Sequence, residues 1–562
     1  MSQKGYRYKT VKLHGVRRKC CKSRNQFARR PDFRQHLRHA DRVKSSRRPP
    51  AQGAWQAGPH PLSRAAQTKP ACRHASEIPK PMVTERHSTS FGPTPGHQPL
   101  SALLARHTTL IAAIVVMLAL GGGSAQAPAE QMAAELIGLG LLIAPALRAP
   151  FGKLLAQDVL FGVLALALVV LFALQLVPLP ATLWSGWPGR ALFAQGDRLM
   201  VGHVLARPWS LDPDETAAAA VFLIPAAAIW LRMRLSDSFT EVWVMAWLAF
   251  LAGSLALALA QVTADYGQWH LYANAHSGLP TGLFANRNHQ AIAMACAIPL
   301  AAGLNRKWQD RAADQRQPTP GGWLFGVTAG AGTIGALLTG SRAGCALLVP
   351  AVLAALVIFY NGRAGGDPRK TRLIVLGTLA AVVLVALGGI VLARLQPGGA
   401  LGLVLSRSYT DDDERYIFWP VVIRMIARYA PWGTGFGAFR RAFEVDEPTD
   451  QLAPLYLNHA HNDWLEFTLE AGLAGIVLAA GFLVWLAMRW APAWRAGADR
   501  SRADPLRQAA GTVVALLLVH SSFDYPLRTV ALSACFAACL ALLSRPAERR
   551  SPRSGGRHGH RA

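Results

Sequence analysis

The sequence predicts an all-helical polytopic membrane protein with about twelve membrane-crossing helices. Hydrophobic residues make up 51% of the chain and charged residues only 16%, well below the roughly 25% charged residues of soluble domains. The apolar residues are also gathered in runs, most of them near the ~20 residues needed to cross a bilayer. In chain order, these runs are 108–125, 132–147, 156–178, 214–231, 239–262, 288–304, 322–340, 343–360, 373–395, 464–488, 509–523 and 527–544.

The basic residues of the short connections predict the orientation of the chain. Lys and Arg follow the even-numbered runs, at Arg148, Lys153, Arg232, Arg234, Arg306, Lys307, Arg311, Arg316, Arg363, Arg369, Lys370, Arg372, Arg489, Arg495, Arg500, Arg502 and Arg507. Basic connections stay in the cytoplasm, so these connections and both termini are expected there. The odd-numbered connections then face outward. They hold the segments with residues capable of chemistry, which are 284–289, 340–342, 396–463 and 523–528.

Five segments are expected along the chain. They are a basic N-terminal arm (1–105), runs one to nine (106–395), an outward loop (396–463), runs ten to twelve (464–544) and a basic tail (545–562).

The N-terminal arm supplies most of the net charge of +27, since residues 1–100 hold 22 Lys and Arg but only 4 acids. Such a stretch can attract nucleic acid or anionic lipid, but it has no apolar periodicity and is expected to be disordered. An alternative is that translation starts at Met82, just before the first run. We assign no function to residues 1–81 and expect no nucleic-acid partner.

Cysteine and histidine spacing gives no indication of a metal or a disulfide framework. The outward loop 396–463 contains none of the seven cysteines, so disulfides are not expected to hold it. No histidine is paired with cysteine at metal-ligand intervals. We therefore expect neither a metal site nor a cofactor.

The outward loop contains one helical pattern followed by glycines. Apolar residues recur at helical spacing from Arg415 to about Tyr429, and Pro431 ends the pattern. Three alternate glycines follow, with Gly435 at their centre. Glycine permits close approach of the backbone to a ligand, although a simple turn after the helix explains the same pattern.

A His-Asn-Asp sequence stands at the start of the tenth run. Asp463, with Glu466 three residues later, resembles a capping box, so Asp463 is expected to be the N-cap of this helix. His461 is placed where an imidazole can take a proton from a hydroxyl group. The alternative for His461 is an ordinary polar residue at the membrane interface.

From about residue 214 to 544 the chain resembles the O-antigen ligase/polymerase family of bacterial envelope glycosyltransferases. The family pattern His-Asn, nine residues, Gly-x-x-Gly is matched by His461-Asn462 and by Gly472 with Gly475. The outward segments 281–289 and 523–528 also look like the family.

Two arginine motifs extend the resemblance. The family pattern Arg, ten residues, Gly fits Arg424 and Gly435, and Ser341-Arg342 is similar to the family's Ser-Arg element. One departure is Ala346, where the ligase form has Leu four residues after the Arg.

The resemblance implies an enzyme that moves a glycan from an undecaprenyl-diphosphate carrier on the periplasmic face of the inner membrane. Arg342 and Arg424 would bind the diphosphate, because guanidinium groups match phosphate oxygens and stay charged. His461 would be the general base, and no metal would be required. The implied substrate-binding residues are Arg287, Arg415, Gly435, Asn462 and Arg528. The alternative for each arginine is contact with lipid headgroups.

The acceptor and two other functions stay open. The acceptor is either lipid A core, in a ligase, or the next lipid-linked repeat, in a polymerase; membrane lipids are expected neighbours in both cases. The weak match after Arg342, the long outward loop and the Arg424–Gly435 spacing favour a polymerase. A transporter or flippase of lipid-linked glycans is an alternative, but transporters carry ionisable residues at mid-membrane, where these runs are nearly uncharged. A non-catalytic envelope assembly protein is another, and it would not need the His-Asn and Arg motifs.

Overall fold

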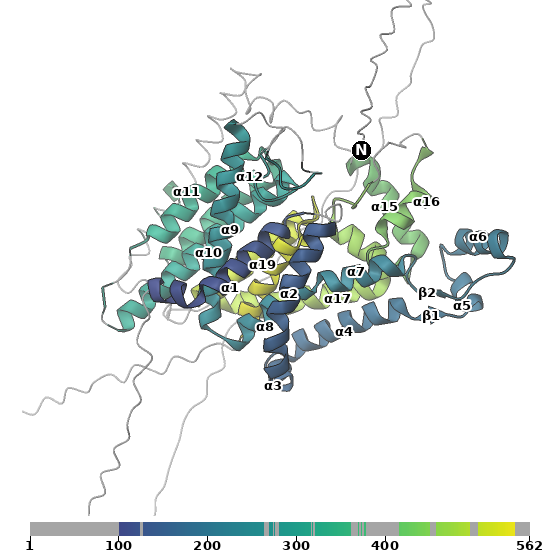
Figure 1. Cartoon of the computed structure of the whole chain (residues 1–562), viewed down its shortest axis with the longest axis horizontal. Helices are drawn as coiled ribbons and strands as arrows, with labels where there is room; N and C mark the ends of the chain where they lie inside the picture. Colours follow the sequence, from purple (N-terminus) through teal and green to yellow (C-terminus); the bar gives the residue numbers. More distant parts are fainter. Residues whose placement is uncertain are drawn as a thin grey trace, which may run out of the picture. The chain divides into compact units, whose positions relative to one another are not determined.

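The computed structural model describes residues 100–123, 128–263, 269–273, 275, 280–315, 317–318, 321–360, 369, 373, 376–377, 415–449, 457–494 and 504–545. Helices dominate these residues (Figure 1), which confirms the predicted helical class. The expected arm and tail lie almost wholly outside the described residues, as does the ninth predicted run, 373–395, apart from three isolated positions.

In the part of the chain that the structure describes, six helical stretches are long and apolar enough to cross a membrane. They are α2 (Pro128–Arg148), α4 (Val159–Leu176), α7 with α8 (Pro213–Phe222 and Ile224–Leu235), α9 (Ser238–Thr263), α12 (Arg342–Tyr360) and α17 (Asp463–Trp494). Among the described residues, four shorter apolar stretches are Ala105–Leu120 of α1 (Leu100–Leu120), α11 (Trp323–Leu338), α18 (Pro505–His520) and α19 (Val530–Ser544). Length and apolar composition thus support a membrane protein.

The remaining elements are more polar or shorter. They are α3 (Phe151–Gln157), β1 (Pro178–Leu179), α5 (Ala181–Ser185), α6 (Ala191–Val201), β2 (Arg207–Pro208), α10 (Arg287–Asp314), α15 (Arg415–Tyr429), α16 (Phe439–Asp446) and the 3-10 turn η3 (Pro526–Arg528). β1 and β2 pair antiparallel. α15 occupies the residues that the amphipathic pattern predicts.

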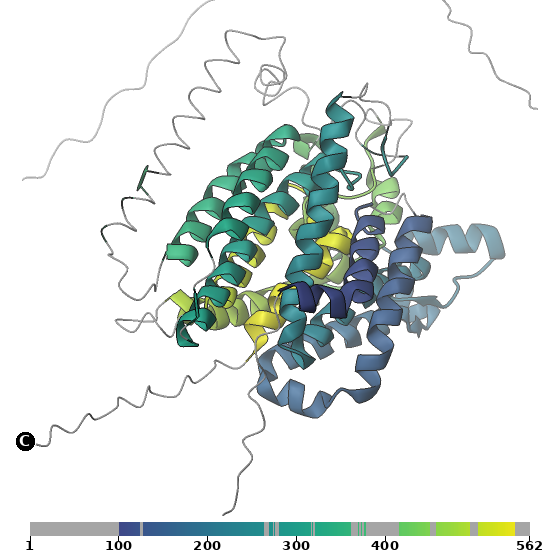
Figure 2. The same ribbon diagram turned by 60° about the vertical axis from the view of Figure 1, so that its left-hand side comes forward.

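Helix α10 is the centre of the packing. Residues 289–306 of this helix are all buried, and it contacts α9, α11, α12 and α18 (Figure 2). Close approach to α12 depends on small side chains, because a Cβ on Gly344 would lie 2.2 Å from the Cβ of Ala291. The starts of α10 and α12, with Arg287 and Arg342, are therefore side by side.

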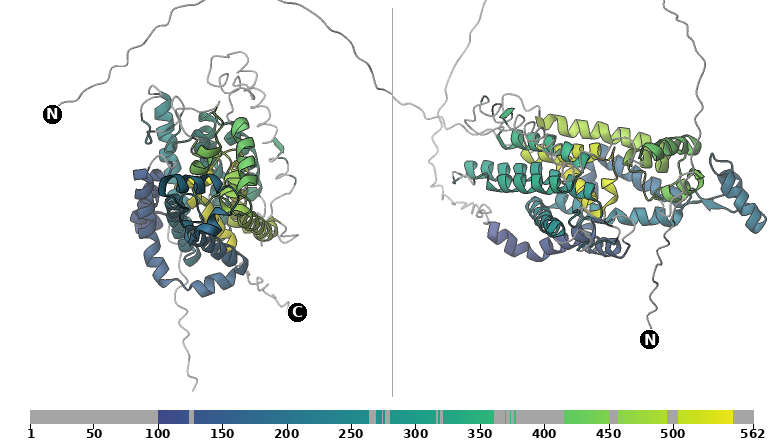
Figure 3. Two further views of the ribbon diagram at one scale, coloured as in Figure 1. Left: turned by 90° about the vertical axis from the view of Figure 1, so that its right-hand side faces the viewer. Right: turned by 90° about the horizontal axis from the view of Figure 1, so that it is seen from above.

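A second group of helices is built on α17. It contacts α4, α15, α18 and α19, and Figure 3 shows it beside the C-terminal helices. The loop after α15 packs onto α17, since the backbone N–H of Thr434 donates to the carbonyl of Leu469 at 2.9 Å. In Figure 1, α5 and α6 extend away from this group.

The odd-numbered connections meet at one end of the helices, here called the site end. The N–H of Ala285 donates to the carbonyl of Gly122, and the N–H of Ala531 donates to that of Gly121. The N–H of Asp463 donates to the carbonyl of Ser521 at 2.8 Å. The connections after α1, α9 and α18 and the start of α17 are thereby joined.

The even-numbered connections meet at the other end through ion pairs. Arg489, near the end of α17, binds Asp158 at 2.7 Å. Arg311 of α10 binds Glu241 at 2.6 Å, and Arg545 binds Asp237 at 3.2 Å. Basic residues near these connections therefore have structural partners.

Gly472 allows α17 to pass the loop that follows α15. Its φ is +60°, and a Cβ there would lie 2.2 Å from the carbonyl oxygen of Pro431. The same carbonyl accepts a hydrogen bond from the N–H of Leu473 at 2.8 Å. The glycine of the His-Asn motif is thus required by packing.

We expect Gly472→Ala to destabilise the protein by roughly 1–3 kcal/mol, because left-handed backbone with a side chain is strained. Gly140→Ala in α2 is the control, since nothing lies within 4 Å of a Cβ at that position and alanine favours helix. Thermal unfolding in detergent measures both. Equal melting temperatures for the two variants would contradict this role of Gly472.

Candidate active site

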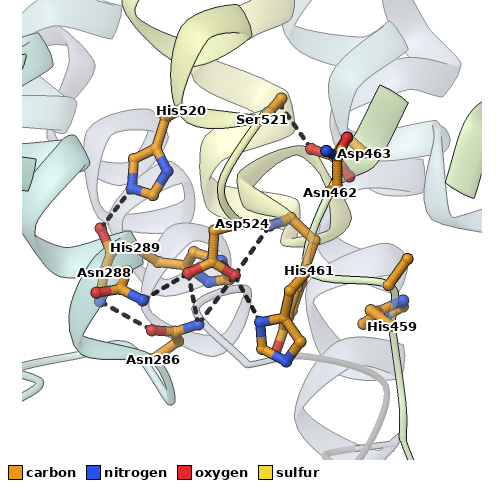
Figure 4. A network of polar contacts seen from close by, with 12 residues as sticks. Asn286, Asn288, His289, His459, His461, Asn462, Asp463, His520, Ser521 and Asp524 are labelled. Carbon is orange, nitrogen blue, oxygen red and sulfur yellow. Dashed lines mark hydrogen bonds and ion pairs between the residues drawn. The ribbon is translucent and has the colours of Figure 1, made fainter. Parts of the chain in front are cut away.

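Asp524, between α18 and η3, is the centre of a polar site at the site end (Figure 4). Its carboxylate is fully buried and accepts hydrogen bonds from Asn288 Nδ2 at 2.6 Å and from Asn286 Nδ2 at 3.3 Å. The N–H of Tyr525 donates at 3.0 Å, and His461 Nδ1 donates at 3.3 Å. A buried carboxylate needs such donors, because an unsatisfied buried charge is strongly unfavourable.

His461 binds Asp524 through Nδ1, and its other ring nitrogen, Nε2, makes no contact with Asp524. With Nδ1 donating to the carboxylate, Nε2 is the unprotonated nitrogen, and it points away from Asp524 in Figure 4. The side chain is 30% exposed, and its φ of +49° is unusual for a residue with a Cβ. A carboxylate that orients the imidazole of a general base is the arrangement found in hydrolase triads.

Asp524 keeps its charge in this site. Burial by itself raises the pKa of its carboxyl group, but the hydrogen bond from His461 and the positive potential of Arg415 and His289 outweigh burial. Together they hold the pKa of Asp524 well below its usual range. Asp524 therefore stays ionised at neutral pH and fixes the tautomer of His461.

Tyr525 separates His461 from two other histidines. Its ring centroid lies 4.8 Å from that of His461, 5.0 Å from that of His289 and 4.5 Å from that of His459. His289 is buried and its Nε2 lies 3.9 Å from Asp524 Oδ1. The aromatic ring thus limits the positions that His461 can take.

A second charged cluster lies next to this site, around Arg528 of η3. Its guanidinium contacts Glu470 at 2.7 Å, Glu466 at 3.4 Å and Asp463 at 3.7 Å. The three acids lie on one face of α17, since their spacing is three and then four residues. Glu466 also accepts from His459 Nδ1 at 2.8 Å. Arg528 is therefore held by protein carboxylates and ties η3 to α17.

This cluster is not arranged around a cation other than Arg528. Within the described ranges, no group of three or more His, Cys, Asp or Glu side chains could hold a metal ion.

The capping of α17 differs from the prediction. Asn462 is the cap, because its Oδ1 accepts from the N–H groups of Trp464 and Leu465, both at 3.1 Å. Its Nδ2 donates to the carbonyl of Ser522 at 3.1 Å. Asp463, predicted to be the N-cap, is instead the first helical residue and accepts from Ser521 Oγ at 2.7 Å. Asn462 therefore has a structural role as the cap, and its predicted contact with substrate stays a prediction.

Three of the predicted arginines lie around the site. Arg415, at the start of α15, is close enough to lower the pKa of Asp524. Arg287 lies between the two asparagines that bind Asp524, and Arg342 is exposed at the neighbouring start of α12. The structure thus places these three residues at the same end as His461.

Two other predicted residues lie elsewhere. Arg424 is exposed on α15, nine residues after Arg415 and therefore about half a turn out of phase with it. Gly435 is buried with φ +101°, and a Cβ there would lie 2.2 Å from Ser210 Oγ. The Cα of Gly435 therefore faces protein, and Arg424 faces away from the side of α15 that carries Arg415.

The residues that sequence reasoning missed are Asp524, Asn286, Asn288 and His289. Their two segments, 281–289 and 523–528, were recognised as motifs, but no role was assigned to these side chains. The sequence signal for these residues is an Asp and two Asn in connections predicted to face outward. Of the side chains in these two segments, the predicted site includes only the arginines.

Fold and site together define a polytopic membrane protein with a His–Asp pair in a polar site at one end. Residues 327–480 match the O-antigen ligase family model, Wzy_C. The chain therefore carries an O-antigen ligase domain, which confirms the predicted resemblance and indicates a membrane enzyme of O-antigen assembly. The matched segment includes Arg342, Arg424 and His461, whereas Asp524 and Arg528 follow it. No curated protein shows significant sequence similarity to the chain.

We expect Arg528→Gln to destabilise the fold by roughly 3–5 kcal/mol, because it leaves buried carboxylates without their cation. The double variant Arg528→Gln/Glu470→Gln should recover part of this loss. Arg441→Gln, on the exposed face of α16, is the control and should be nearly neutral. Melting temperatures in detergent test this. An Arg528→Gln protein as stable as the control would indicate that Arg528 is available for substrate.

Proposed function

We propose that the protein is a glycosyltransferase that transfers or polymerises undecaprenyl-diphosphate-linked glycan on the periplasmic face of the bacterial inner membrane. The product would be O-antigen or an exopolysaccharide. The observation that carries the proposal is the His461–Asp524 pair. Asp524 binds Nδ1 of His461 and leaves Nε2 for a substrate, and Arg287, Arg342 and Arg415 lie at the same end of the helices. The O-antigen ligase match over residues 327–480 supports the same reaction class.

In the proposed reaction, His461 Nε2 takes the proton of an acceptor hydroxyl group. The hydroxyl oxygen forms a bond to the anomeric carbon of the donor sugar, and the bond from that carbon to the diphosphate oxygen breaks. Undecaprenyl diphosphate leaves as an anion, so its departing oxygen needs no proton, and arginine side chains would stabilise its charge without a metal. Asp524 stabilises the imidazolium that forms on His461.

Positive charge near His461 would hold the diphosphate. Arg415 is the best-supported residue for this role, because its electrostatic influence reaches Asp524. Arg287 and Arg342 are the next candidates, since they begin the adjacent helices α10 and α12. Charge-assisted hydrogen bonds from guanidinium groups suit phosphate oxygens.

The acceptor defines the finer function. The family description favours a ligase, which would transfer the glycan to lipid A core. A polymerase, favoured by the departure at Ala346, would transfer it to the next lipid-linked repeat. A clean gene deletion followed by gel analysis of the surface glycan separates them. If the deletion strain carries a single repeat on lipid A core, the protein is a polymerase. If the strain leaves long polymer on the carrier, the protein is a ligase.

We expect His461→Ala and Asp524→Asn each to reduce glycan transfer by about two to four decades, because both remove general-base catalysis. Arg415→Lys should restore little relative to Arg415→Ala, since Lys lacks the guanidinium fork. His203→Ala is the control, as His203 is exposed near α6. The assay is the glycan ladder in a complemented deletion strain. Wild-type ladders from both His461→Ala and Asp524→Asn would refute the enzyme proposal.

The orientation of the site is testable separately. Reporter fusions should place the 396–463 loop in the periplasm and residues 305–321 and 489–508 in the cytoplasm, as the positive-inside bias predicts. Alkaline phosphatase activity reports the first location, and a cytoplasmic fluorescent reporter reports the second. A cytoplasmic 396–463 loop would be incompatible with a periplasmic reaction.

A further inference from the structure

A cavity of about 320 Å³ lies at the end of the helices opposite the His461 site. It is bordered by the early part of α1, the last turns of α2 and α8, and the start of α9. Most of its wall is apolar, formed by Leu110, Ala144, Pro145, Leu235, Phe239 and Val242. Polar groups are fewer and consist of two arginines, two serines and a histidine.

The Nε side of the Arg232 guanidinium is held by the protein at the wall of the cavity. Its Nε donates to the carbonyl of Leu141 at 2.7 Å, and its guanidinium carbon lies 6.0 Å from the ring centroid of Phe239. Across the described part of the chain, the two terminal amino groups of Arg232 have no protein partner. The guanidinium therefore presents its outer fork, which is the edge that binds phosphate oxygens in pairs.

Other polar groups of the cavity add donors to this fork. Arg148, at the end of α2, lines the same cavity and has no acidic partner among the residues that the structure describes. Ser236 and Ser238 lie beside it, with their hydroxyl oxygens 2.9 Å apart. His107 lines the opposite wall, where non-helical backbone angles (φ −116°, ψ 15°) interrupt α1. Two cations without an acid indicate an anionic ligand.

The mixture of an apolar wall and a cationic end matches one kind of molecule. At the same end, Arg311, Arg489 and Arg545 each have an acidic partner, whereas Arg148 and Arg232 line one cavity and have no acidic partner among the described residues. Basic pockets between membrane-spanning helices bind anionic lipid headgroups. We propose that this cavity binds one anionic phospholipid, with Arg148 and Arg232 on its phosphate and an acyl chain along the apolar wall.

Native mass spectrometry of the full chain in detergent tests this proposal with phosphatidylglycerol, and with phosphatidylcholine as the zwitterionic comparison. We expect one phosphatidylglycerol to bind in preference to phosphatidylcholine. Arg148→Ala and Arg232→Ala should each weaken binding about fivefold, because each basic group near a lipid headgroup contributes a comparable attraction. Lys153→Ala, an exposed charge of the same end, is the matched control and should bind as the wild type does.

Two further measurements keep the result decisive. Arg148 is exposed, so Arg148→Ala should fold normally even if Arg232→Ala does not. Arg232→Lys keeps the positive charge but lacks the guanidinium fork. Inorganic phosphate is also titrated in a thermal-shift assay, at concentrations that leave the lipid complex intact. We expect that phosphate alone does not raise the melting temperature of the protein. Equal binding of the two lipids, unchanged binding by Arg148→Ala, or stabilisation by phosphate alone would each overturn the proposal.

Discussion

The buried carboxylate of Asp524 connects three parts of the chain that are far apart in sequence. Its strongest donor, Asn288, is 236 residues away, and His461 is 63 residues away. A carboxylate removed from water requires this set of donors, and the same donors fix the start of α10, the residues before α17 and the turn after α18 relative to one another. The position of His461, on which its proposed role as general base depends, is thus a consequence of satisfying one buried charge.

The cluster around Arg528 gives that geometry a rigid support. Asp463, Glu466 and Glu470 belong to α17, which begins directly after His461, and Arg528 follows Asp524 by four residues. A shift of the His461 backbone away from Asp524 would therefore tend to move α17 relative to η3 and so to separate a buried ion network. Such positioning by surrounding interactions is what a catalytic pair needs to stay within reach of its substrate.

Local patterns predicted much of the fold, while the site depended on contacts that spacing does not reveal. α15 has the predicted bounds because its apolar period and Pro431 are both local signals. The cap of α17 was misassigned because Asn462 and Asp463 are both good N-caps, and only the bonds of Asp463 to Ser521 distinguish them. Asp524 was missed because its importance comes from burial and from donors on another helix. The resemblance found His461, which is a motif residue, but not the partner that orients it.

The arrangement of α15 divides the roles of its arginines. Arg415 and Arg424 are about half a helical turn out of phase, so one rigid helix cannot direct both toward the same diphosphate. Arg415 acts on the charge of Asp524, whereas the exposed Arg424 faces the other side of α15. The proposed lipid-linked donor would extend from its diphosphate both into the glycan and into the membrane. In that proposal Arg415 would contact the reacting phosphate, and Arg424 a part of the donor or acceptor more distant from His461.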